Sequence, residues 1–257
     1  MNLYDQCRVI KYNQGQIEQV DDVVIADYPL TIILNGQELT TLVCSPGAWP
    51  ELVVGFLRSS GLINNRQQLL HMNLDQESGY CQVEIPSYSQ EIDNSGKRFY
   101  NPETNSSLYF IRDASQLKPV LTSAKFTVPE LLHLSQQLDE QSRTFQITGA
   151  AHSVGMGDKD QLLFRYEDIG RHNALDKVLG YALLNDISSV DKCVILSGRV
   201  AAEMLLKAAH AEIPLVLSRA APTALALRIA RELGITVVGF ARGDRLNIYC
   251  HEWRIAI

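Results

Sequence analysis

The segment that decides the fold is residues 192–240, which read KCVILSGRVAAEMLLKAAHAEIPLVLSRAAPTALALRIARELGITVVGF. An apolar run at 192–196 is followed by a polar turn and by an alanine-rich stretch that favours a helix. The same order then recurs, with strands expected at 213–217 and 235–240 and a second helix between them. Strands that alternate with helices are typical of parallel strands joined by right-handed crossovers. Residues 145–257 are therefore predicted to form an α/β core.

The first part of the chain has a different pattern, made of short β-type runs. Antiparallel strands are expected within residues 7–44, and Asn35-Gly36 predicts a hairpin turn between two of them. Pro50 opens a stretch whose apolar spacing predicts an amphipathic helix that ends near Gly61. Another strand is expected at 80–85.

Three regions follow from this reading, and the fold class is α/β (α+β). A β-rich N-terminal lobe with one helix is expected at 1–93, and a polar connecting loop rich in turn-forming residues at 94–126. The α/β domain is expected at 127–257. It would begin with a helix that Thr127 caps and that runs to about Gln141.

Composition limits the classes of protein that this chain can belong to. The 257 residues are 46% hydrophobic, without an apolar run long enough for a membrane helix and without a basic-then-apolar start. A cytoplasmic protein is therefore expected. The net charge of −6 arises in residues 1–144, which hold 10 basic and 17 acidic side chains. Such a chain lacks the broad cationic surface that nucleic-acid binding requires, so neither nucleic acid nor membrane is an expected partner.

Arginines gather where the predicted parallel strands end. The turns after consecutive parallel strands meet at one edge of a sheet, beside helix N-termini, and ligands bind there. Each of these turns carries arginine, whose forked donors match phosphate oxygens. A phosphorylated ligand is the functional interpretation for the set, whereas any one loop arginine is as readily explained by solvation. The four residues are Arg199, Arg219, Arg242 and Arg245.

A second dense segment is residues 166–177, YEDIGRHNALDK. The paired carboxylates Glu167 and Asp168, beside Arg171 and His172, are suited to orienting a base edge or binding a partner. The alternative is a helix N-terminus with favourably placed acidic residues. Residue types alone leave these two interpretations close to even.

Two further patterns are better explained by chance or by local structure. His210-Ala211-Glu212 matches the H-x-E of zinc deaminases but lacks the P-C-x-x-C that would complete the site, so no protein-ligated metal is expected. Gly155-Met156-Gly157 is half of a dinucleotide fingerprint and is predicted to be a hairpin turn.

Several segments in the same order resemble the FdhD family of formate dehydrogenase accessory proteins. The most specific is EDIGRHNALDK at 167–177. Others are SPG at 45–47, ELVVGFL at 51–57, TGAAH at 148–152, SGR at 197–199, APT at 221–223 and GFARGDR at 239–245. The similarity spans most of the chain.

The resemblance implies a homodimer with a cytidine-deaminase-like larger domain. It also implies binding of the bis-molybdopterin guanine dinucleotide form of the molybdenum cofactor, for which GDP would be a mimic. Formate dehydrogenase and a cysteine desulfurase are the implied partners. The residues expected to contact the cofactor are Arg171, His172, Arg199, Arg219, Phe240, Ala241, Arg242, Gly243, Asp244 and Arg245.

The chain departs from the family where sulfur is carried. In the family a C-x-x-C loop receives sulfur as a persulfide, and the corresponding residues here, 94–125, contain no cysteine; Ala150 also replaces the second glycine of the family's TGGxH segment. Of the cysteines elsewhere, Cys81 and Cys193 are expected to be buried in strands. Cys44 is expected near the surface, and His251 beside Cys250 is expected to lower the pKa of that thiol.

Three functions therefore remain open at this stage. The first is a sulfurtransferase-type maturation factor with a displaced thiol. The second is a protein that binds the cofactor or a guanine nucleotide as a chaperone or regulator without sulfur chemistry. The third, a nucleotide hydrolase, lacks a metal site. No catalytic residue can be assigned.

Overall fold

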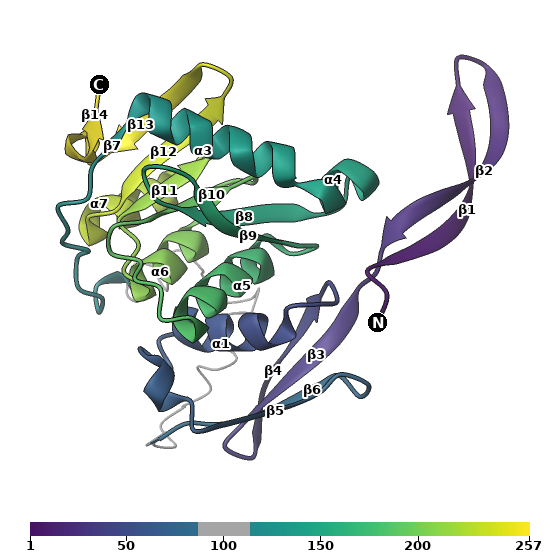
Figure 1. Cartoon of the computed structure of the whole chain (residues 1–257), viewed down its shortest axis with the longest axis horizontal. Coiled ribbons are helices and arrows are strands. Elements are labelled where there is room, and N and C mark those ends of the chain that lie inside the picture. Colours follow the sequence, from purple (N-terminus) through teal and green to yellow (C-terminus); the bar gives the residue numbers. More distant parts are fainter. Residues whose placement is uncertain (87–113) are drawn as a thin grey trace.

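The computed structural model describes residues 1–86 and 114–257. It has a layered α/β body from which a long two-stranded arm projects (Figure 1). The body contains a six-stranded sheet and a four-stranded sheet with helices packed between them (Figure 1). The predicted mixed α/β fold class is confirmed. Within the described residues no helix is long and apolar enough to cross a membrane.

The central sheet has the strand order β13-β12-β11-β10-β8-β9. Its middle strands run parallel, as the repeated strand-turn-helix pattern predicts, and they are β10 (Cys193–Leu196), β11 (Leu215–Ser218) and β12 (Thr236–Arg242). The flanking strands are antiparallel to their neighbours and are β8 (His152–Gly157), β9 (Leu162–Asp168) and β13 (Arg245–Cys250).

One turn prediction in this sheet is wrong. Gly155 and Gly157 lie inside β8 rather than in a hairpin turn, which falls between β8 and β9. Side chains pack closely on both glycines: a Cβ on Gly157 would lie 2.7 Å from a methyl carbon of Leu134, and one on Gly155 2.5 Å from a methyl carbon of Leu162. The two glycines therefore mark a closely packed strand and not a chain reversal.

Helices cover both faces of the central sheet. On one face lies α3 (Val128–Gln141), followed by the short α4 (Arg143–Thr148). On the other face lie α5 (Arg171–Leu184), α6 (Ala202–His210) and α7 (Ala224–Leu233). The predicted cap of α3 is confirmed, since the Thr127 hydroxyl accepts from the Glu130 amide and the Glu130 carboxylate accepts from the Thr127 amide.

The N-terminal sheet packs against a helix of its own. Its order is β4-β3-β6-β5, and its strands are β3 (Tyr28–Leu34), β4 (Gln37–Cys44), β5 (His71–Asp75) and β6 (Tyr80–Glu84). The Asn35-Gly36 turn between β3 and β4 is confirmed, with positive φ at both residues. The predicted helix is α1 (Trp49–Ser59), which buries Leu52, Val53 and Phe56; the short helix η1 (Arg66–Gln68) follows.

The two parts of the body meet where α1 crosses α5. A Cβ on Gly55 of α1 would collide with the carbonyl oxygen of Asp176, and one on Gly180 of α5 with the carbonyl oxygen of Glu51. Only glycine at both positions allows the two backbones to approach this closely. The crossing therefore makes one compact body of the two sheets.

The arm is a hairpin of β1 (Tyr4–Asn13) and β2 (Gln16–Ile25), and it joins neither sheet. The described part of the lobe expected at 1–93, residues 1–86, thus contains an arm and a separate packed sheet. Most of the predicted connecting loop at 94–126, namely residues 94–113, lies outside the described residues. Its last part is held near the C-terminus, where Arg254 of the short helix η3 (Glu252–Arg254) donates to the Val120 carbonyl at 3.0 Å, and β7 (Phe126–Thr127) pairs with β14 (Ile255–Ala256).

Candidate functional site

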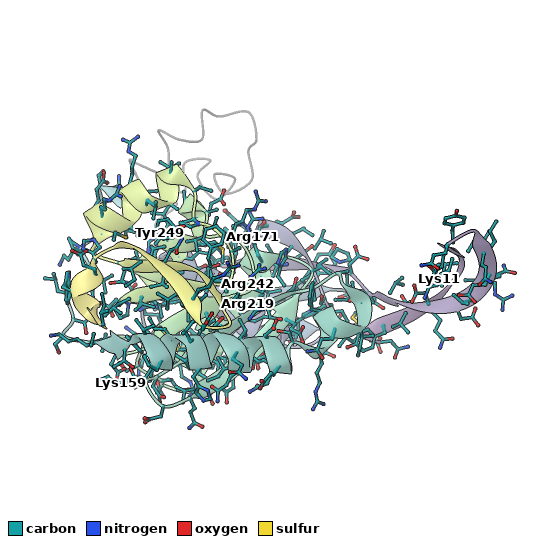
Figure 2. The ribbon with its side chains drawn as sticks, turned by 90° about the horizontal axis from the view of Figure 1, so that it is seen from above. Lys11, Lys159, Arg171, Arg219, Arg242 and Tyr249 are labelled. Atoms are coloured by element: carbon teal, nitrogen blue, oxygen red, sulfur yellow. The ribbon has the colours of Figure 1, made fainter. Side chains whose placement is uncertain are left out.

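Five segments of the chain meet at one edge of the central sheet. The parallel strands β10, β11 and β12 end there, and β8 begins there because it runs antiparallel to β10. His152 at the start of β8 pairs with Asp168 at the end of β9, so the N-terminus of α5 reaches the same edge. The arginine edge, as we call it, comprises Arg171, Arg199, Arg219, Arg242 and Arg245, three of which are labelled in Figure 2.

Three of these arginines keep most of their donors available. Arg199, Arg242 and Arg245 are exposed, and within the described ranges none of them is within ion-pair distance of a carboxylate. Among the described residues the Arg242 guanidinium makes one hydrogen bond, from its Nε to the Arg219 carbonyl at 2.8 Å. Unpaired guanidinium groups at the carboxyl ends of parallel strands are suited to binding phosphate.

Arg219 differs from these three arginines because its guanidinium has partners within the chain. Its Nη2 lies 2.9 Å from the Asp139 carboxylate, and its Nη1 donates to the Ser135 carbonyl at 3.4 Å. Both partners are on α3, so the guanidinium ties the end of β11 to that helix. Arg219 also accepts a hydrogen bond from Arg242 through its carbonyl, and its predicted contact with the cofactor stays a prediction.

A second group of side chains surrounds the N-terminus of α5. The Nε of Arg171 is buried and has no hydrogen-bond partner among the described residues. His172 Nε2 lies 3.5 Å from Glu203 Oε2. Burial, together with the charges of Lys207 and Arg171, lowers the pKa of His172 to about 3, so that this imidazole is neutral near pH 7.

His152 belongs to this group but was absent from the sequence-predicted contacts. Burial is the main cause that lowers its pKa, and the charges of Arg171 and Arg199 act in the same direction. A Cβ on Gly198 would lie 3.2 Å from His152 Nδ1, so the turn after β10 passes close to the ring. In the sequence, only its place in the TGAAH segment at 148–152 pointed to this residue. A single histidine forms no spaced motif from which a site could be predicted.

Strand β12 carries an aromatic residue, Phe240, two positions before Arg242. Phe240 is 42% exposed and has φ +53°, a conformation that costs energy for a bulky side chain. Its amide donates to the Ala220 carbonyl at 3.2 Å, within a bulge of β12. Gly243 and Asp244 form the exposed turn. Ala241 is the exception among the predicted contacts, because its side chain is buried in the core and its carbonyl accepts from Ser135.

Most of the dense segment 166–177 is internal structure, which neither sequence interpretation anticipated. Buried Asp168 lies 2.7 Å from Lys177 Nζ and accepts from the amides of Ser45 and Gly170. Buried Asp176 pairs with Lys207 at 2.5 Å. Glu167 accepts from the amides of Thr144 and Phe145 in the first turn of α4. These carboxylates hold the elements around α5 together and are not available to a ligand.

Known proteins show the same sequence pattern over the whole chain. The profile of the FdhD/NarQ family matches residues 25–256. A "Sulfur carrier protein FdhD" of Bacillus pumilus is 41% identical over 253 residues, covering 96% of both chains. The Bacillus subtilis protein of that description is 38% identical, covering 96% of this chain and 95% of its own.

The chain belongs to the FdhD/NarQ family.

A solved structure agrees with this assignment. The crystal structure of a candidate formate dehydrogenase accessory protein from Desulfotalea psychrophila superimposes with a TM-score of 0.82 at 25% identity. The match covers 99% of this chain and 100% of the other. The predicted family resemblance is thereby confirmed for sequence and fold together.

The thiols of this family member are poorly placed for sulfur chemistry. Cys44, expected near the surface, is buried, and burial near Asp168 raises its pKa to about 12. Burial also raises the pKa of Cys250 despite the adjacent histidine, so both expectations were wrong. As predicted, Cys81 and Cys193 are buried in strands. The fifth, Cys7, is exposed on the arm.

Proposed function

We propose that this protein is a formate dehydrogenase accessory protein that binds the bis-molybdopterin guanine dinucleotide cofactor at the arginine edge and does not itself carry sulfur. The observation that supports binding most strongly is the set of exposed, carboxylate-free arginines Arg199, Arg242 and Arg245 in a chain of net charge −6. Membership of the FdhD/NarQ family makes this cofactor the natural candidate for the anion. The proposed setting is the cytoplasm, with formate dehydrogenase as client.

The residues at the edge fit the chemistry of that ligand. Its phosphates require forked cationic donors, which Arg242, Arg245 and Arg199 provide. Its aromatic rings require an exposed π face, and Phe240 is held beside the arginines by a strained backbone. Arg171 adds a buried Nε donor without a partner in the described part of the chain. When bound, the cofactor would supply the molybdenum centre; the residues here bind and orient it.

Neutral histidines complement the arginines in this arrangement. His172 stays uncharged near pH 7 because burial and neighbouring cations lower its pKa. A neutral ring can both donate and accept a hydrogen bond, as recognition of a base edge requires, whereas a charged one only donates. We therefore assign charge neutralisation to the arginines and orientation to His172.

In our proposal this chain lacks the sulfur-transfer step of the family's activity. A sulfur carrier requires an accessible thiolate, because the thiolate attacks the donor's persulfide. Cys44, Cys81, Cys193 and Cys250 are buried with raised pKa values, and residues 87–113 contain no cysteine at all. A second protein would have to deliver sulfur, so a cysteine desulfurase is not required as a direct partner.

A calorimetric titration with GDP tests the binding site. Each charge-assisted contact contributes about 1.5–3 kcal/mol, so Arg242→Ala should weaken binding by about tenfold or more. Affinity should also decrease as salt is added, since partly exposed charges are screened. Arg231→Ala is the matched control, because Arg231 is an exposed arginine in the last turn of α7, away from the edge. If Arg242→Ala and Arg245→Ala both bind GDP like the parent protein, the edge is not the binding site.

A further inference from the structure

The first turn of α6 places a carboxylate against the histidine at the start of α5. Glu203 is the second residue of α6, and its Oε2 lies 3.5 Å from Nε2 of His172, the second residue of α5. Both side chains are partly exposed, the carboxylate by 35% and the imidazole by 26%. The N-termini of the two helices therefore meet at this pair, four residues after Arg199 in the chain.

Glu203 contacts the imidazole rather than a cation of the arginine edge. Within residues 1–86 and 114–257 it has no ion-pair partner other than His172, although Arg199 precedes it by four residues. A glutamate in a first helical turn stabilises its helix through the helix dipole, and this effect alone would explain its presence. The dipole does not explain why the carboxylate lies against a ring nitrogen of another helix.

The position of the carboxylate decides which nitrogen of the His172 ring holds the proton. Burial and the charges of Lys207 and Arg171 lower the pKa of His172, so that the ring is neutral near pH 7 and has one N–H and one acceptor nitrogen. A carboxylate attracts an N–H and repels a lone pair, so Glu203 favours the proton on the facing nitrogen, Nε2. The separation of 3.5 Å is long for a hydrogen bond, so this preference is electrostatic.

The other ring nitrogen, Nδ1, is left for a ligand. Among the described residues it has no hydrogen-bond partner, and it is not one of the fully buried side-chain atoms that lack a partner. With the proton on Nε2, Nδ1 can only accept a hydrogen bond. The Watson–Crick edge of guanine has two adjacent donors, N1–H and the 2-amino group, whereas N1 of adenine is an acceptor. An acceptor at this position therefore matches guanine better than adenine.

We propose that Glu203 is a positioning residue of the arginine edge, which holds the proton of His172 on Nε2 and so presents Nδ1 to the donors of a guanine base. The inference rests on the proposed binding of a guanine dinucleotide at this edge. It adds selection of the base to that function. Arginines recognise the phosphates of any nucleotide and aromatic stacking tolerates every base, so neither can select guanine.

The ¹⁵N chemical shifts of the His172 ring test the tautomer without any ligand. In the full chain with labelled histidine, His172→Gln assigns the signals, and the parent ring should hold its proton mainly on Nε2 at pH 7. Glu203→Ala should increase the share of the form with the proton on Nδ1. Glu232→Ala, at an exposed glutamate of α7, is the matched control and should leave the spectrum unchanged. A parent ring protonated mainly on Nδ1, or an unchanged ring in Glu203→Ala, would overturn the proposal.

Calorimetric titrations with GDP and with ADP test the selection of the base. The parent should bind GDP about tenfold more tightly than ADP, because ADP leaves a polar group of the site unmatched. Glu203→Ala and His172→Gln should each reduce this ratio by about threefold or more. His172→Asn should retain more of it, because its amide oxygen can lie near the position of Nδ1.

The same titrations separate this inference from the proposed function. Arg242→Ala should weaken the binding of GDP and ADP alike, because it removes a phosphate contact. If Arg242→Ala does so but Glu203→Ala leaves the ratio of the two affinities unchanged, only the role of Glu203 is wrong. If the parent binds neither nucleotide, the proposed function is wrong and this inference is wrong with it, whichever tautomer the ring shows.

Discussion

Lys177 and Lys207 are buried basic side chains, and each has a carboxylate as its partner. Lys177 Nζ lies 2.7 Å from Asp168, and Lys207 Nζ lies 2.5 Å from Asp176. Removing one partner of a buried pair leaves an uncompensated charge, which costs about 3–5 kcal/mol. Asp168→Asn, which nearly preserves shape, should therefore lower the free energy of unfolding by that amount in urea titrations.

The control for this substitution is a pair of the same kind at the surface. Asp191→Asn removes the exposed partner of Lys192 and should change the unfolding free energy by at most about 1 kcal/mol. If the two substitutions cost the same, the buried pairs do not hold α5 in place, and the structural role assigned to the EDIGRHNALDK segment is wrong.

The lowered pKa of His172 predicts that the stability of the protein depends on pH. Its pKa is lowered from 6.5 to about 3 in the folded protein, so the unfolded chain binds the proton first as the pH falls. The contribution of His172 is therefore complete above about pH 6.5 and is lost progressively between pH 6.5 and pH 3. His172→Gln should make the urea midpoint less sensitive to pH between these limits. His71→Gln replaces an exposed histidine and should leave this pH sensitivity unchanged. If the urea midpoint changes equally with pH in the parent protein and in both variants, the assignment to His172 is wrong.

Residue roles were the part that sequence reasoning predicted least well. Arg199, Arg242 and Arg245 lie at the sheet edge that the strand-turn-helix pattern predicts. The pattern locates them because each turn starts where a parallel strand ends. Arg219 has the same local sequence signal, but its guanidinium is taken up by Asp139 of α3, a tertiary contact that no local pattern encodes. Cys44 was misplaced for the same reason, since α1 and α5 bury it.

The crossing of α1 and α5 provides a test of how the elements are held together. Gly55 and Gly180 are in contact with backbone of the other helix, and a methyl group at either position has no room. Overpacking of this kind typically costs about 1–3 kcal/mol. Gly55→Ala and Gly180→Ala should each lower the unfolding free energy by at least this amount, although alanine is the better helix former. Glu232→Ala, on the exposed side of α7, controls for helix propensity and should be neutral or stabilising.

Elements with a strong local signal were predicted within a few residues. The capped helix α3 and the alternating strands and helices from β10 to β12 are examples, because capping, turn chemistry and apolar periodicity all indicated the same structure. The Gly155-Met156-Gly157 turn was wrong because glycine in a strand and glycine in a turn look alike in sequence. The separation of the arm from the N-terminal sheet was also missed, since alternation does not specify which strands pair.

The whole molecule combines an edge of exposed arginines, which we propose binds an anion, with four buried thiols. Its family is that of proteins described as sulfur carriers. Four thiols are buried, and the remaining one, Cys7, lies on the arm rather than at the edge. We therefore propose that this protein binds the cofactor without carrying sulfur, although its relatives are described as sulfur carriers.

The most direct test is intact-mass measurement after incubation with a cysteine desulfurase and cysteine, with the Bacillus subtilis relative as positive control. We predict no stoichiometric addition of sulfur to this chain, while the relative gains it. Any trace addition should map to Cys7 and disappear in Cys7→Ser without affecting GDP binding. A stoichiometric persulfide on this chain that is lost in Cys7→Ser, Cys44→Ala or Cys250→Ala, and that restores a formate dehydrogenase lacking its accessory factor, would contradict the account.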